Sequence, residues 1–205
     1  MPLELKINPQ NPEPAKINKV VEILKNGGII VYPTDTIYGL GCDIFNKKAV
    51  AKIYQLKKRE AQKPLSIICH DFKDIAQYAL VQDYAFRLMK KVLPGPYTFV
   101  LKAKNTMPKI FLAKNKTVGV RIPNGLICLA IVKELGNPII STSLNISGQA
   151  PFTNPAQLNK ELKNKIDLII NAGTLPQEPS SVIDLSSPQP VVLRRGKGDL
   201  SLFPF

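Results

Sequence analysis

The stretch GGIIVYPTDTIYGLGCDIFNKKAVAKIYQLKKREAQKPLSIICH, residues 27–70, decides how the rest of the chain is organised. Its apolar residues 29–32 predict a buried strand, which a polar loop, an amphipathic helix, a cationic cluster and a second buried strand follow. The loop offers the hydroxyls of Thr34 and Thr36 and the flexible backbone of two glycines, and the cluster adds the charges of Lys57, Lys58, Arg59 and Lys63. Hydroxyls, backbone amides and cations together are the donors that an anion requires, so the stretch predicts an anion site.

The length and composition fit one α/β domain. With 205 residues, 44% of them hydrophobic, the chain can bury a complete core. We expect one domain over residues 1–205, with an extended segment at 1–13 and strands and a tail at 179–205, because no repeat or composition shift marks a boundary. No run of 18 or more apolar residues occurs and the N-terminus lacks a basic segment followed by an apolar one, so the sequence predicts neither a membrane span nor a signal peptide.

The three cysteines indicate a reducing compartment. Cys42, Cys69 and Cys128 are odd in number, lie beside apolar residues and lack paired metal-ligand spacing. We interpret them as buried, reduced thiols of a cytoplasmic protein.

The charge balance is strongly basic. The sequence has 28 Lys and Arg against 15 Asp and Glu, a formal net charge of +13. A field of this sign attracts nucleotides, nucleic acids and other polyanions. Many of the lysines fall on outward faces of expected helices, where they mainly confer solubility, so charge alone leaves RNA contact open.

The order of elements predicts a mixed α/β sheet. Helices are expected at 14–25, 46–58, 72–79, 83–92, 126–135 and 155–164, with a short one at 108–113. Strands are expected at 3–7, 29–32, 65–69, 97–101, 118–122, 139–140, 166–172, 181–185 and 191–194. Because strands and helices interleave but several strands come in pairs, the pattern favours a mixed sheet over a regular doubly wound one.

Two later segments add polar chemistry. Arg121 lies in the apolar strand VGVRI and should point to a carboxylate, either an internal Asp or Glu or a bound ligand, of which we favour the ligand. The segment STSLNISG, residues 141–148, follows an apolar strand with four hydroxyls and an amide. It is either a binding loop or an Asx or Ser/Thr turn that caps the next element.

The catalytic inventory is short. His70 is the only histidine, no nucleophile elbow or Walker sequence occurs, and the carboxylates show no metal-binding pattern. We therefore expect no covalent nucleophile and no dedicated metal site. The remaining hydroxyls, amides and cations suit an enzyme that works by proximity and charge stabilisation.

Five motifs, in order along essentially the whole chain, resemble the Sua5/YciO/YrdC family. They are PTDTIYGLGCD at 33–43, LKKR at 56–59 with KPL at 63–65, PGPYT at 94–98, VRIP at 120–123 and STSLNISG at 141–148. Segments at 7–12, 69–71, 85–90 and 181–199 are most similar to the YciO-type branch.

The resemblance implies a twisted α/β fold with flanking helices and a large, basic, concave cavity. The best-known family activity is that of a nucleotidyltransferase, which makes L-threonylcarbamoyl-adenylate from L-threonine, bicarbonate and ATP and releases pyrophosphate. The product feeds the threonylcarbamoyladenosine modification of tRNA, so contact with tRNA or double-stranded RNA and with partner proteins of that modification is also implied. Mg²⁺ would arrive with the ATP and would require few protein ligands of its own.

The binding positions of the family can be carried over residue by residue. The nucleotide-contacting positions correspond to Lys57, Arg59, Lys63, Thr117, Ser143, Asn145, Thr153 and Arg194, of which Thr117 is the weakest match. The threonine-side positions correspond to Thr36, Arg121, Ser143 and Ser180. Each residue alone has an alternative interpretation as a helix-end cation or a turn hydroxyl, but the set converges from separated segments.

One departure concerns the amino-acid half of the site. Family synthases often carry a histidine inside the strand after the KPL-like motif, facing the amino-acid substrate, and the matching residue here is Ile68. His70 shares that face only if the strand continues so far. Two alternatives therefore stay open: a YciO-type protein that processes or hydrolyses an acyl-adenylate, and a non-catalytic RNA-binding module.

Overall fold

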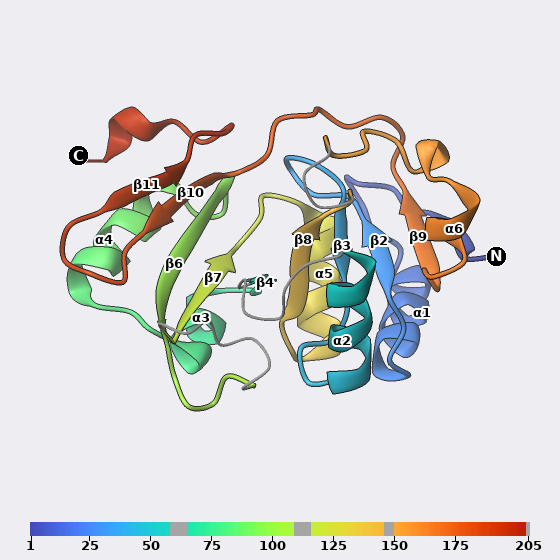
Figure 1. Cartoon of the computed structure of the whole chain (residues 1–205), viewed down its shortest axis with the longest axis horizontal. Helices are drawn as coiled ribbons and strands as arrows, with labels where there is room; N and C mark the ends of the chain where they lie inside the picture. The colour runs from blue at the N-terminus through green and yellow to red at the C-terminus, as the bar shows by residue number, and fades with distance from the viewer. Residues whose placement is uncertain (58–64, 109–115, 146–149, 204–205) are drawn as a thin grey trace.

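One large sheet forms the centre of the protein, which we describe from a computed structural model (Figure 1) covering residues 1–57, 65–108, 116–145 and 150–203. In that part of the chain the sheet has 11 strands in the order β1-β9-β2-β3-β8-β4-β7-β6-β10-β11, with β5 paired to β6. Parallel pairs such as β4 with β7 and antiparallel pairs such as β6 with β7 both occur, so the mixed sheet is confirmed.

The strands and helices have the following bounds. The strands are β1 Leu3–Lys6, β2 Ile30–Tyr32, β3 Gly39–Gly41, β4 Ser66–Ile68, β5 Ala79–Leu80, β6 Tyr97–Ala103, β7 Thr117–Arg121, β8 Ile139–Ser143, β9 Leu168–Asn171, β10 Ser181–Asp184 and β11 Val191–Arg194. The helices are α1 Pro14–Lys25, α2 Lys47–Leu56, α3 Phe72–Tyr78, α4 Asp83–Val92, α5 Leu126–Leu135 and α6 Lys160–Lys163, with short 3-10 turns at Pro155–Gln157 and Leu200–Leu202.

Local sequence signals set the ends of the first two helices. α1 has Pro14 in its first turn, where the missing N–H costs nothing, and it stops before Gly27, whose φ of 80° requires glycine. α2 begins where the Asn46 side chain accepts a hydrogen bond from the Ala49 N–H at 3.0 Å. It ends two residues earlier than expected, and Lys57 is its C-cap.

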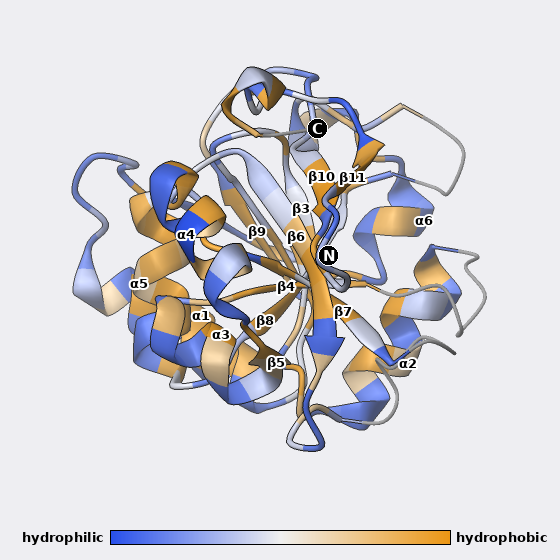
Figure 2. Cartoon of the chain, turned by 90° about the vertical axis from the view of Figure 1, so that its left-hand side faces the viewer, coloured by the Kyte–Doolittle hydropathy of each residue, from blue (hydrophilic) through white to orange (hydrophobic). Residues whose placement is uncertain are grey.

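Alternate residues of the central strands pack into two apolar clusters on opposite faces. Ile30 of β2 belongs to the cluster that includes α1 and α5, whereas Val31 belongs to the one that includes α2, α3 and α4. In β4, Ile68 likewise belongs to the cluster with α1 and α5, and Ile67 belongs to the cluster with α2, α3 and α4. Figure 2 shows α1 and α5 on one side of the strands and α2 on the other. Both faces are therefore covered over this half of the sheet.

The face that α1 and α5 cover carries polar and small residues farther along the sheet. Ser141, Ser66, Gly119 and Val100 lie next to one another across β8, β4, β7 and β6. Together they line a cavity. A Cβ atom on Gly119 would lie 2.7 Å from Ser66 Oγ, which is a steric clash, so glycine avoids this clash on the cavity floor.

Three expectations about elements are wrong. Residues 39–41, expected in a loop, form β3 between β2 and β8, and the short β5 was also not expected. The helix expected over 155–164 is instead a 3-10 turn and the short α6, because Leu158 between them is extended. The helix expected over 108–113 lies almost wholly outside the described residues.

The three cysteines are free and buried, as expected. Burial raises the pKa of all three thiols, that of Cys128 to about 12. Among the described helices, none is both long and apolar enough to cross a membrane.

Candidate functional site

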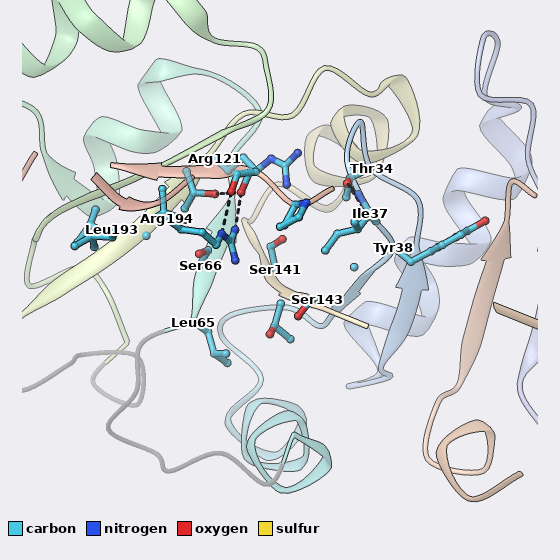
Figure 3. A pocket seen from close by; sticks show the side chains of 18 residues that line it. Thr34, Ile37, Tyr38, Leu65, Ser66, Arg121, Ser141, Ser143, Leu193 and Arg194 are labelled. Atoms are coloured by element: carbon cyan, nitrogen blue, oxygen red, sulfur yellow. Dashed lines mark hydrogen bonds between the residues drawn. The ribbon is translucent and has the colours of Figure 1, made fainter. Parts of the chain in front are cut away.

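A polar cavity of about 280 Å³ opens on the same face of the sheet as α1 and α5, beyond the part that these helices cover (Figure 3). Of the predicted site residues, four line it, namely Arg121, Ser143, Ser180 and Arg194. They come from β7, β8, the residue before β10 and the end of β11. The sheet therefore brings residues up to 73 positions apart, from 121 to 194, to one place.

Arg121 is almost fully buried and bonds to the loop after β2. Its Nη2 donates to Asp35 Oδ1 at 2.5 Å and to Thr36 Oγ1 at 2.9 Å. The carboxylate partner is thus internal, and our preference for a ligand carboxylate is corrected. Thr36 is completely buried and serves this arginine without lining the cavity itself.

The loop that carries Asp35 is shaped by Thr34. Thr34 Oγ1 accepts hydrogen bonds from the Thr36 and Ile37 N–H groups at 3.1 and 3.2 Å, and donates to the Ile37 carbonyl at 2.6 Å. From the other side, Lys197 Nζ donates to the Asp35 carbonyl at 2.8 Å. A hydroxyl turn and a cation therefore hold the carboxylate of Asp35 next to Arg121.

Arg194 is the second guanidinium of the cavity and lies at its exposed rim. Its Nε and Nη2 donate to the carbonyl and the hydroxyl of Ser180 at 3.0 and 3.1 Å, and Ser180 Oγ is 2.9 Å from Thr98 Oγ1. Partial burial, and secondly the charge of Arg121, lower the pKa of Arg194. Two arginines close enough to repel each other favour an anion between them.

Lys57 supports the loop that follows β8. Its ammonium, which is buried, donates to the carbonyls of Ser143 and Asn145 at 2.8 and 2.7 Å and also to Asn145 Oδ1. Ser143 Oγ bonds to the same amide oxygen at 2.6 Å. The structure thus brings three predicted nucleotide positions together, but Lys57 does not line the cavity.

The other predicted nucleotide positions lie elsewhere. Thr117 is buried at the start of β7, opposite Lys102, and Thr153 lies in a loop where its hydroxyl bonds to Gln157. Neither lines the cavity. Arg59 and Lys63 lie outside the described residues.

Ile68 and His70 do not face the cavity. Ile68 is completely buried in the cluster that includes α1 and α5, and β4 ends there. His70 follows the strand. Its backbone N–H donates to Asp74 Oδ2 at 2.9 Å, and its imidazole Nδ1 is 3.6 Å from the Asp71 carboxylate. The strand does not carry His70 to the face of Ile68.

Sequence reasoning missed several residues of the site. Ser66, Thr98 and Ser141 line the cavity, and Asp35 pairs with Arg121. Each lay inside a quoted motif or an expected strand, and the available signal was a lone polar residue among apolar ones for Ser66 and Thr98 and a run of polar residues for Asp35 and Ser141. Across the described ranges, no three His, Cys, Asp or Glu side chains group so as to hold a metal ion.

The chain is similar in sequence and in fold to known proteins. Residues 22–196 match the family model Sua5_yciO_yrdC, described as telomere recombination. The chain is 42% identical to the uncharacterized protein YciO of Escherichia coli K12 over 200 residues, 96% of this chain and 97% of that one. The crystal structure of E. coli YciO superposes with a TM-score of 0.94 at 40% identity and full coverage of both chains.

Two further relatives have names or titles that mention threonine chemistry. A putative threonylcarbamoyl-AMP synthase of Methanocaldococcus jannaschii is 39% identical over 94% of this chain and 92% of its own. The crystal structure of P. abyssi Sua5 complexed with L-threonine has a TM-score of 0.86 at 31% identity, over 96% of this chain and 57% of that one. The chain therefore belongs to the Sua5/YciO/YrdC family.

Proposed function

We propose that this protein is a nucleotide-binding transferase that makes L-threonylcarbamoyl-adenylate from L-threonine, bicarbonate and ATP. The observation that carries the proposal is the convergence of Arg121 and Arg194 with the hydroxyls of Ser143 and Ser180 on one cavity. Arginines match carboxylates and phosphates in geometry and charge. A homologue whose structure contains L-threonine supports the amino-acid half.

The amino acid and the nucleotide would bind to different walls of the cavity. The amino acid would lie near Arg121 and Ser180, and the nucleotide near Ser143, Asn145 and Arg194, with Arg59 and Lys63 as further predicted contacts. Lys57 would act through the Ser143–Asn145 loop that it holds. Mg²⁺ would enter with the triphosphate and neutralise part of its charge.

In this proposal the enzyme works in the cytoplasm and supplies the modification of tRNA. Three free, buried thiols suit a reducing compartment. The net charge of +13 supports an encounter with polyanions such as ATP and tRNA.

The decisive assay mixes the protein with ATP, Mg²⁺, L-threonine and bicarbonate and measures pyrophosphate and the adenylate by mass spectrometry. We expect both products to depend on threonine and bicarbonate, and Arg194→Gln to reduce them. Arg195→Gln, at the exposed neighbouring residue that does not line the cavity, is the matched control. Pyrophosphate no higher than with the Arg194→Gln variant would rule the proposal out.

No histidine is among the described residues that line the cavity, which favours a second candidate, the processing of an acyl-adenylate. The position of the synthase-type histidine is occupied by Ile68, an apolar residue outside the cavity. The test supplies L-threonylcarbamoyl-adenylate and follows the release of AMP. The wild-type protein should then release AMP faster than the Arg194→Gln variant. That result, with no adenylate synthesis in the first assay, would support processing of an acyl-adenylate. If neither occurs and tRNA binds with a steep salt dependence, the RNA-binding alternative holds.

A further inference from the structure

The ion pair between Arg121 and Asp35 is only half formed. The two side chains are 6% and 11% exposed, and the contact between them joins one nitrogen, Nη2, to one oxygen, Oδ1. Arg121 Nε and Asp35 Oδ2 are buried and have no hydrogen-bond partner within the described ranges. A spare donor on the cation and a spare acceptor on the anion therefore lie in one ion pair.

This arrangement differs from a structural salt bridge. Arginine and carboxylate prefer two parallel hydrogen bonds, and a buried charged group without its partners is unfavourable. Arg121 also lines the cavity, while Thr34 and Ile37, on either side of Asp35, line it as well. In Figure 3 the Arg121 guanidinium extends toward the segment that carries Thr34 and Ile37. Arg121 therefore presents one half of the incomplete pair to the cavity, and Asp35, which does not line the cavity, lies directly behind it in the loop between two lining residues.

We infer that Asp35 determines specificity by requiring a ligand that carries both a carboxylate and an ammonium group, the zwitterion of an α-amino acid. The carboxylate of the ligand takes the Arg121 guanidinium, and the released Asp35 carboxylate accepts hydrogen bonds from the ammonium. This inference rests on the amino-acid half of the proposed function. It adds a role for Asp35 and excludes ligands that carry one of the two charges alone.

Charge balance is the physical reason. A ligand with only a carboxylate would take Arg121 and leave Asp35 buried without a counter-ion, which is costly. A ligand with only an ammonium would meet Arg121 and its neighbour Arg194, two like charges. A zwitterion adds no net charge and gives each member of the old pair a new partner. Lys197, bonded to the Asp35 carbonyl, holds the main chain while the side chain turns.

The first test compares three ligands on the wild-type protein by calorimetry: L-threonine, 3-hydroxybutanoate, which lacks the amino group, and 1-amino-2-propanol, which lacks the carboxylate. We expect L-threonine to bind at least about tenfold more tightly than either, the effect of losing one charge-assisted hydrogen-bonded pair. Equal affinities for L-threonine and 3-hydroxybutanoate would overturn the inference without any variant.

The second test uses Asp35→Asn, with Asp83→Asn as a matched control at the start of α4, away from the cavity. We expect Asp35→Asn to weaken L-threonine binding and to strengthen 3-hydroxybutanoate binding, so that the preference disappears, while Asp83→Asn keeps it. An unchanged preference in a folded Asp35→Asn protein overturns the inference. The two hypotheses separate, because a zwitterion preference without adenylate synthesis refutes only the proposed function, and synthesis with an unchanged preference refutes only the role of Asp35.

Discussion

Ile68 and Arg121 are register partners on the parallel strands β4 and β7, and their side chains leave the sheet on the same face into different surroundings. Ile68 is enclosed by the apolar cluster of α1 and α5, whereas Arg121 reaches Asp35 and lines the cavity. The position at which family synthases often carry a histidine is thus adjacent to the arginine but inside the core.

Replacing Ile68 by histidine should therefore destabilise the protein without improving threonine binding. We expect Ile68→His to lower the free energy of unfolding by about 1–3 kcal/mol, because an imidazole would be buried among apolar side chains. Urea unfolding measures the change, and Ile68→Val, with an expected loss of about 0.5–1.5 kcal/mol, is the control for altered volume. A stable Ile68→His variant with tighter threonine binding would show that this position does reach the ligand.

The pair of Arg121 and Asp35 should show strong energetic coupling. Arg121→Met leaves the Asp35 carboxylate buried and alone, which should cost about 3–5 kcal/mol of unfolding free energy. Adding Asp35→Asn removes the unpaired charge, so the double variant should be more stable than Arg121→Met. Denaturant unfolding of the four proteins gives the coupling, and additive effects would contradict it.

Lys57 should contribute to stability as well as to activity. Lys57→Ala leaves the carbonyls of Ser143 and Asn145 without this donor, so we expect a loss of about 2–3 kcal/mol of unfolding free energy. The control is Lys52→Ala, an exposed lysine of the same helix, which should change little. If Lys57→Ala weakens ATP binding with an unchanged Tm, the lysine contacts the nucleotide directly instead.

The buried thiols should make the protein less stable in alkali. The pKa of Cys128 is about 12 in the folded protein and about 8.5 for a thiol in an unfolded chain. Between these values the folded state holds a proton that the unfolded state has lost, so stability is full below about pH 8.5 and falls as pH rises. The loss should approach about 1.4 kcal/mol per pH unit for each thiol.

Urea unfolding between pH 7.5 and 10 measures this decline. A Cys128→Ala variant removes one titrating thiol and should show a shallower dependence. An identical dependence in the two proteins would mean that Cys128 ionises as readily in the folded chain as in the unfolded one.

The sequence predicts elements well where periodicity and capping agree. The bounds expected for α1, α4 and α5 match the structure, because apolar spacing agrees with Pro14 and Gly27 for α1, with Pro94 after α4 and with Gly136 after α5. β3 escaped prediction because Gly39 and Gly41 have low strand propensity. Close packing explains why a glycine occupies position 41 of this strand. A Cβ on Gly41 would lie 2.4 Å from the Ile140 carbonyl oxygen and 2.8 Å from the Tyr32 ring.

The site was predictable in its residue types more than in its contacts. Arg121, Ser143, Ser180 and Arg194 converge on one cavity, which the motifs indicate. The partner of Arg121 could not be read from the sequence, since Asp35 lies 86 residues away and is one of 15 acidic residues. The division into domains and the individual binding roles stay predictions.

The hydrogen bond from Lys197 to the Asp35 carbonyl joins segments 162 residues apart. The parallel pairing of β10 with β6 likewise brings Ser180 and Arg194 to the cavity from late in the chain. Contacts between such distant segments close large loops and form slowly. The cavity is therefore complete only once the late residues of its lining, from Pro179 to Arg194, have docked on the sheet.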